Sequence, residues 1–88
     1  MPSRSVALAN RRGLHARASA KFVTLASELT ATVEVEKDGN KVVGTSIMGL
    51  MMLGAAMGDE ILITTEGDGA DEALLALVAL VEGRFGED

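Results

Sequence analysis

The chain has 88 residues, a net charge of −5 at pH 7 and 48% hydrophobic residues, which suit one folded domain with one modest core. Its acidity, with two Phe and no Tyr or Trp, argues against nucleic-acid binding, which favours basic patches and stacking aromatic side chains. The absence of Cys excludes disulfides and thiolate sites, and a single His leaves too few ligands for a zinc site. No apolar run is long enough to span a membrane and no secretion signal is recognisable, so we expect a cytoplasmic protein without membrane insertion.

The first half of the chain is predicted to form a strand, a helix and a second strand. Residues 4–9 alternate in polarity and put Val6 and Leu8 on one face, as in a half-buried strand. Residues 32–36 alternate in the same way. Between them, residues 16–29 predict a helix, because apolar side chains recur at helical spacing at Ala18, Phe22, Leu25, Ala26 and Leu29.

The second half is predicted to add a hairpin strand, a short helix, a strand and a long helix. Residues 37–40 are typical of a tight turn, so residues 41–43 return as the second arm of a hairpin. A short apolar helix follows, and its inward stripe is predicted to be Ile47, Leu50 and Leu53. Residues 59–66 predict a strand. The longest helix covers residues 70–85, with a buried stripe of Leu74, Leu77, Val78, Val81 and Phe85.

The predicted order is therefore β-α-β-β-α-β-α. Such an order favours a two-layer α+β sandwich, in which three helices cover one face of a four-stranded antiparallel sheet and leave the other face open. We find no linker, repeat or low-complexity tract, so residues 1–88 are expected to form a single domain.

The segment Gly13-Leu14-His15-Ala16-Arg17 holds the only histidine, at the point where the first helix is predicted to begin. A lone histidine is most often an ordinary surface or core residue. This position is more informative, because a helix N-terminus presents unpaired N–H groups and favours an anion. The backbone N–H groups of Ala16 and Arg17, with the Arg17 guanidinium, are therefore predicted to stabilise a phosphate at His15.

The short second helix offers two further candidate sites. Ser46 is placed to cap its N-terminus, and capping alone would explain a serine there. Methionines at helical spacing usually belong to a core, but these three lie off the predicted inward stripe, which suggests an adaptable docking patch. Together with side chains of the first helix, they are predicted to surround His15 as a partner interface: Ala20, Lys21, Thr24, Met48, Met51 and Met52.

The first motif, together with Gly44-Thr45-Ser46-Ile47-Met48-Gly49 at this separation, resembles HPr, the family of histidine-containing phosphocarriers of the bacterial phosphotransferase system. The resemblance covers essentially the whole chain. It implies that His15 carries phosphate on Nδ1, that Arg17 steadies the phosphate, and that Ser46 is a regulatory phosphorylation site for an ATP-dependent kinase in those bacteria that have one. The family often has proline where this chain has Ala18, and alanine is an adequate helix former there.

The resemblance implies a phosphoryl carrier and not an enzyme. Its partners would be enzyme I, which phosphoenolpyruvate charges, the IIA domains for sugar uptake, and a kinase or phosphorylase acting on Ser46. No cofactor or metal is expected, and the chain is expected to be a monomer. Two alternatives stay open: a regulatory phosphocarrier of the nitrogen-related branch, and a small acyl-phosphate hydrolase on a ferredoxin-like fold. The hydrolase would leave the long final helix as an appendage.

Overall fold

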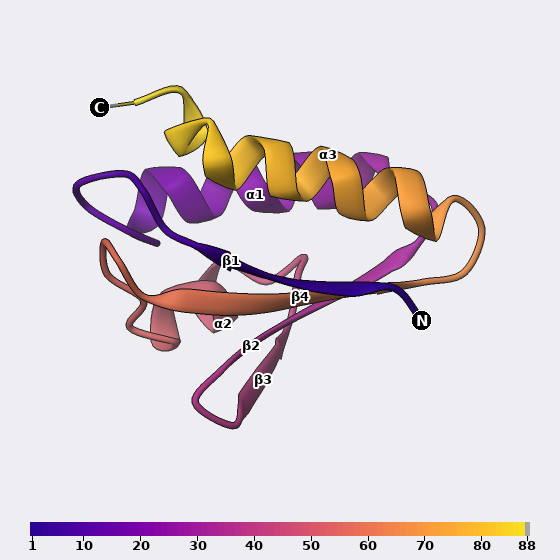
Figure 1. Ribbon diagram of the computed structural model, residues 1–88, viewed down its shortest axis with the longest axis horizontal. Coiled ribbons are helices and arrows are strands. Elements are labelled where there is room, and N and C mark those ends of the chain that lie inside the picture. The colour runs from indigo at the N-terminus through magenta and orange to yellow at the C-terminus, as the bar shows by residue number, and fades with distance from the viewer. Residues whose placement is uncertain (88) are drawn as a thin grey trace.

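A computed structural model describes residues 1–87. Four strands form one sheet: β1 (Ser3–Ala7), β2 (Thr32–Lys37), β3 (Asn40–Val43) and β4 (Glu60–Glu66). Three α-helices and one 3₁₀ turn complete the chain: α1 (Ala16–Glu28), α2 (Ile47–Met52), α3 (Ala70–Glu82) and η1 (Arg84–Gly86). Figure 1 shows the sheet below the two long helices.

All neighbouring strands of the sheet are antiparallel, in the order β1-β4-β2-β3. The register aligns the apolar positions, since Ile61 lies opposite Val6, and Ile63 lies opposite Val35. The period of two along each strand then directs these side chains to the same face, where all four are buried.

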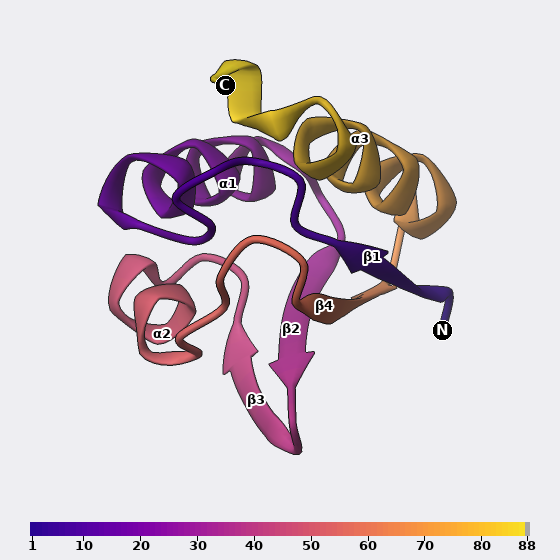
Figure 2. The same cartoon turned by 60° about the vertical axis from the view of Figure 1, so that its left-hand side comes forward.

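Helices α1 and α3 lie side by side along that buried face, while α2 packs against α1 beside the sheet (Figure 2). Phe22 of α1 and Leu77 and Val81 of α3 are wholly buried in the same core as the strands. The predicted α+β open-faced sandwich is therefore confirmed. Because α3 packs on β1 and β4, it is part of the core and not the appendage that a ferredoxin-like fold would leave.

Three local predictions were wrong. Ile47 was expected to face the core but is exposed, since Leu50 and Leu53 alone fill the space beneath the short α2. Leu29 is not helical, because its backbone is extended and its N–H only caps the end of α1. The last helix was expected to reach Phe85 but ends at Glu82, because the backbone becomes left-handed at Arg84 and Phe85.

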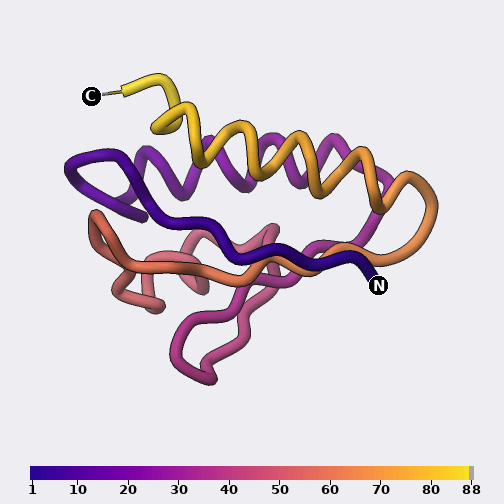
Figure 3. Tube along the Cα trace, viewed as in Figure 1, coloured from indigo at the N-terminus to yellow at the C-terminus, as the bar shows by residue number. Residues whose placement is uncertain are grey.

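The final segment of the chain lies beside the start of α1. Figure 3 shows the final segment above the loop that leads into α1. Hydrogen bonds join the same segments, between His15 and Glu87 and between Lys21 and Phe85. Within residues 1–87, the helices are all too short to cross a lipid bilayer.

Candidate functional site

The loop before α1 is fixed from below by a buried asparagine. Asn10 is wholly buried, and its Nδ2 donates to the carbonyl of Gly13 at 2.8 Å. The N–H of Leu14 donates to the carbonyl of Ala55 at 3.0 Å, and the Leu14 side chain is buried. Gly13 has φ of +62°, a left-handed conformation that glycine adopts without strain. These contacts give His15 a defined position at the start of the helix.

His15 is itself the N-cap residue of α1. Its Nδ1 accepts a hydrogen bond from the backbone N–H of Arg17 at 3.3 Å. The N–H groups of Ala16 and Ala18 have no protein acceptor within residues 1–87. The ring nitrogen Nδ1 therefore faces the electropositive end of a 13-residue helix, where an anion is favoured.

The other ring nitrogen contacts a carboxylate that sequence reasoning missed. His15 Nε2 lies 2.9 Å from Oε1 and 3.1 Å from Oε2 of Glu87. This contact leaves the side chains of His15 and Glu87 only 14% and 17% exposed. A residue 72 positions away gives no periodic signal in the sequence.

The environment of Glu87 favours its ionised form. A hydrogen bond from Asn10 Nδ2 at 2.9 Å, followed by the hydrogen bond to His15, lowers the pKa of the carboxyl below its ordinary 4.5. Because the folded-state pKa is the lower one, the contact contributes stability above the ordinary pKa and loses it as the pH falls through the folded-state value. The carboxylate is thus charged at neutral pH.

A tight reversal after α3 carries Glu87 to the histidine. Arg84, Phe85 and Gly86 all have positive φ, between 54° and 74°, which turns the chain back over α1. The Phe85 side chain is buried, and Lys21 Nζ donates a hydrogen bond to the backbone carbonyl of Phe85 at 2.7 Å. One signal was available in the sequence, because two glycines that flank Arg84 and Phe85 favour a turn rather than a continued helix.

The remaining predicted residues of the first helix differ in exposure. Arg17 is exposed, and its guanidinium forms no ion pair with any residue from 1 to 87. Thr24 is exposed and Ala20 is half-buried. Lys21, which was predicted to contact partners, also donates a hydrogen bond to the carbonyl of Phe85 in the final segment.

Helix α2 presents an apolar surface beside the start of α1. Ser46 caps it, since its Oγ accepts a hydrogen bond from the N–H of Gly49 at 3.0 Å. Met48 and Met52 are 69% and 79% exposed, and Met51 is also exposed. The prediction that these methionines lie outside the core is correct. We call the exposed apolar side chains of this helix the α2 patch: Ile47, Met48, Met51 and Met52.

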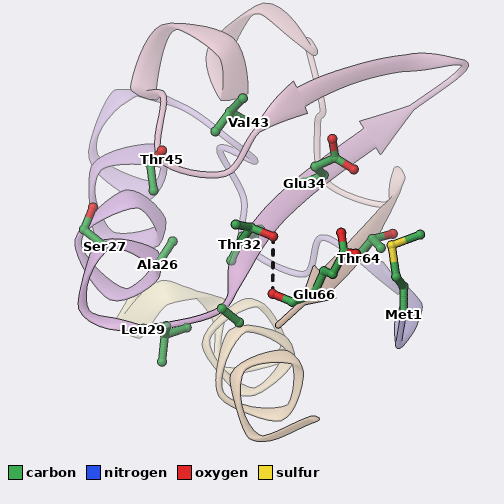
Figure 4. Close-up of a pocket in the computed structure, with 12 residues that line it drawn as sticks. Met1, Ala26, Ser27, Leu29, Thr32, Glu34, Val43, Thr45, Thr64 and Glu66 are labelled. Carbon is green, nitrogen blue, oxygen red and sulfur yellow. Dashed lines mark hydrogen bonds between the residues drawn. The ribbon is translucent and has the colours of Figure 1, made fainter. Parts of the chain in front are cut away.

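The candidate site lies apart from the hollow at the other end of α1. A hollow of about 510 Å³ lies at the opposite end of α1, between Leu29, β2 and β4 (Figure 4). Neither His15, Arg17 nor Ser46 lines it. Residues 1–87 also contain no group of three His, Asp or Glu side chains arranged to hold a metal ion.

Comparison with known proteins agrees with this arrangement. Residues 2–83 match the PTS-HPr family, described as "PTS HPr component phosphorylation site". The phosphocarrier protein HPr of Neisseria meningitidis serogroup A is 48% identical over 87 residues, which cover 99% of this chain and 98% of that protein. The phosphocarrier protein NPr of Shewanella violacea is 42% identical over 84 residues, which cover 96% and 92%.

A solved structure has the same fold over its full length. The crystal structure of HPr-C-His from Thermoanaerobacter tengcongensis superposes with a TM-score of 0.95 at 44% sequence identity, covering 100% of this chain and 99% of that one. Family, sequence and fold therefore agree, and this chain belongs to the HPr family of phosphocarrier proteins.

Proposed function

We propose that this protein accepts a phosphoryl group from enzyme I on Nδ1 of His15 and donates it to IIA domains. The observation that carries the proposal is the direction of Nδ1, which faces the N–H of Arg17 beside the unpaired N–H groups of Ala16 and Ala18. A phosphoryl group on Nδ1 would arrive where these donors and the helix dipole stabilise negative charge.

The same donors explain why the group would remain transferable. At an exposed helix terminus, the dipole contributes only about 0.3–1 kcal/mol to the binding of an anion. The Arg17 guanidinium, exposed in the second position of α1, supplies a further charge-assisted donor. Modest stabilisation suits a carrier, because a deep electrostatic trap would prevent donation. The protein is thus a substrate of other enzymes and not itself an enzyme.

Incubation with phosphoenolpyruvate and enzyme I tests this function. The expected product is a phosphoprotein whose phosphate is lost in acid and retained in alkali, as expected of a phosphorylated histidine. Adding a IIA domain should discharge it. Failure to acquire phosphate from charged enzyme I, or turnover of acyl phosphates by this protein alone, would contradict the proposal.

Charge supports the choice of partner. The protein is acidic overall, yet five of its eight basic residues lie on the segments that surround His15. All five are exposed: Arg11, Arg12, Arg17, Lys21 and Arg84. Such a local excess of positive charge attracts an acidic or phosphate-bearing surface and accelerates its association at low ionic strength.

The α2 patch supplies the apolar part of the proposed interface. Four exposed apolar side chains on one six-residue helix exceed what single scattered surface residues would give. Because α2 packs against α1, a partner that reaches His15 meets the patch at the same time. Met48 belongs to the α2 patch. We propose that Ala20 and Thr24 of α1 contact the same partner surface.

Met48→Asp is expected to raise the KM of enzyme I for this protein roughly tenfold, the equivalent of about 1.4 kcal/mol, because it puts a charge into a desolvated contact. The thermal melt should hardly change, since Met48 is 69% exposed. Leu75→Asp on α3, where Leu75 is 63% exposed, is the matched control and should leave KM unchanged. Equal KM values for the two variants would show that the α2 patch is not part of the interface with enzyme I.

Ser46 is proposed as a regulatory phosphorylation site. A phosphate at this N-cap adds roughly −1.5 to −2 charges at the favourable end of α2, so the fold should be retained. Inhibition would instead come from repulsion, because the charge lies next to the α2 patch and opposes an acidic partner. The proposal requires a kinase and a phosphorylase that act on Ser46.

Ser46→Asp is expected to melt at the same or a higher temperature than wild type and to accept phosphate from enzyme I much more slowly. Aspartate preserves the cap and adds one charge. Ser46→Ala should melt slightly lower, since it loses the hydrogen bond to Gly49, and should transfer at a near-normal rate. Thermal melts and initial rates of phosphorylation measure both effects. An unchanged rate in Ser46→Asp would leave Ser46 with its capping role alone.

The similarity to the NPr of Shewanella violacea supports a second candidate within the family, a regulatory phosphocarrier of the nitrogen-related branch. Its chemistry at His15 would be the same. The two candidates differ in the acceptor, so competition between a sugar-specific and a nitrogen-related IIA domain for the phosphorylated protein distinguishes them.

A further inference from the structure

We propose that Glu87 is a positioning residue for phosphoryl transfer, because its carboxylate keeps the proton of the His15 ring on Nε2 both before and after Nδ1 receives the phosphoryl group. This inference rests on the proposed function of His15. It extends that function by assigning a role to the carboxylate that contacts the ring.

The two contacts of the ring agree on one tautomer. Nδ1 accepts from the N–H of Arg17, so it carries a lone pair and no proton. Nε2 lies 2.9 and 3.1 Å from the two oxygens of Glu87, and an ionised carboxylate only accepts hydrogen bonds. Nε2 must therefore be the nitrogen that donates, and Nδ1 is the free nucleophile.

The carboxylate is held by partners other than the histidine. Oε1 of Glu87 accepts from Nδ2 of the wholly buried Asn10. Lys21 Nζ holds the carbonyl of Phe85, whose buried side chain anchors the turn two residues earlier. An asparagine, a lysine and a buried aromatic ring thus converge to place one carboxylate, which is the arrangement expected of a built contact rather than an accidental one.

Among residues 10–22 and 83–87, Glu87 is also the only anion. The loop 10–15, the first half of α1 and the turn 83–87 carry five cations and this single carboxylate. The cations are Arg11, Arg12, Arg17, Lys21 and Arg84. Helix α2 contributes no charged side chain. Within these segments, Glu87 is therefore the only charged group that can accept a hydrogen bond from Nε2.

The position of that proton matters most when the group leaves. On acceptance, the lone pair of Nδ1 forms a bond to phosphorus while the donor's bond to phosphorus breaks and its electron pair stays with the donor. On donation, the P–Nδ1 bond breaks and its electron pair returns to Nδ1. With a proton on Nε2 the departing ring is a neutral imidazole, whereas without it the ring departs as an imidazolate anion, a far poorer leaving group. The carboxylate stabilises the protonated, phosphorylated ring as an ion pair.

The test compares donation rates across pH. Wild type, Glu87→Ala and Glu87→Gln are phosphorylated by enzyme I, and transfer to a IIA domain is followed in single turnovers between about pH 6 and pH 9. All three should become phosphorylated. In Glu87→Ala the fall in rate with rising pH should begin about half to one unit lower, making donation roughly three- to tenfold slower at pH 8. Glu87→Gln, which keeps an oxygen but no charge, should fall between the two.

A matched control and a second readout separate this role from a structural one. Glu82→Ala removes an exposed carboxylate of α3 that pairs with Arg4, and its pH profile should match wild type. Nitrogen NMR of the unphosphorylated His15 ring should show less of the Nε2-protonated tautomer in Glu87→Ala. Superimposable pH profiles, or a rate lowered evenly at every pH, would overturn the role of Glu87. Failure of wild type to become phosphorylated would instead overturn the proposed function.

Discussion

His15→Ala is expected to abolish phosphoryl acceptance from enzyme I, because the variant lacks the only imidazole in the chain. No other histidine or cysteine is available to replace it as the nucleophile. The fold should survive, although the variant loses the N-cap contact to Arg17, a loss that typically costs about 1 kcal/mol. Phosphate incorporation from labelled phosphoenolpyruvate measures the first effect, and a thermal melt measures the second.

His15→Asn separates the chemistry from the cap. Asparagine is a favoured N-cap residue, so its side-chain oxygen can accept the N–H of Arg17 and preserve the start of α1. We expect this variant to melt close to wild type and to incorporate no phosphate. Phosphate retained by either variant would show that the acceptor is another residue and would refute the assignment of His15.

Gly13→Ala is expected to have the largest effect on stability among conservative changes near the site. An added Cβ would lie 2.3 Å from the carbonyl oxygen of Ala55 and 2.8 Å from Cα of Ala56, and the φ of +62° disfavours any side chain. Left-handed strain and overpacking together should lower the free energy of unfolding by about 2–4 kcal/mol. The same displacement would break the hydrogen bond from Leu14 to Ala55 and move His15, so phosphoryl acceptance should also slow.

Gly39→Ala is the control for the backbone conformation alone. Gly39 has φ of +83° in the β2–β3 turn, and an added Cβ there would meet nothing within 4 Å. It should cost only the left-handed penalty, about 1–2 kcal/mol, and leave phosphorylation unchanged. Urea unfolding of both variants measures the difference. Equal losses would mean that the contact between Gly13 and Ala55 is soft enough to absorb a methyl group.

The sequence predicts the sheet and the long helices well because burial imposes periodicity. Val35 lies between Glu34 and Glu36 and is buried in the paired strands, as are Val6 and Ile63. Periodicity gives a wrong prediction where the apolar spacing continues beyond the residue at which the helical backbone ends. Phe85 keeps the helical spacing of α3 and is buried, yet it lies in a left-handed turn after the helix has ended.

The candidate site was predictable only in part, for a physical reason. The N-cap position of His15 and the cap at Ser46 follow from neighbours within four residues, so local rules identify them. Glu87 reaches the ring only after α3 has packed on the sheet and the chain has turned. The two residues are 72 positions apart in the sequence, so rules based on neighbouring residues cannot predict their contact. Buried Asn10 is likewise explained only once Glu87 and Gly13 are seen as its acceptors.

The span of 72 residues between His15 and Glu87 also sets when the site is complete during synthesis. A ribosome releases the chain from its N-terminus, so His15 emerges long before β4 and α3 can close the core. Through that interval the ring has neither the sheet beneath its loop nor the carboxylate beside Nε2. The complete site therefore belongs to the folded chain as a whole, and a growing chain gains the contact between His15 and Glu87 only after residue 87 has left the ribosome.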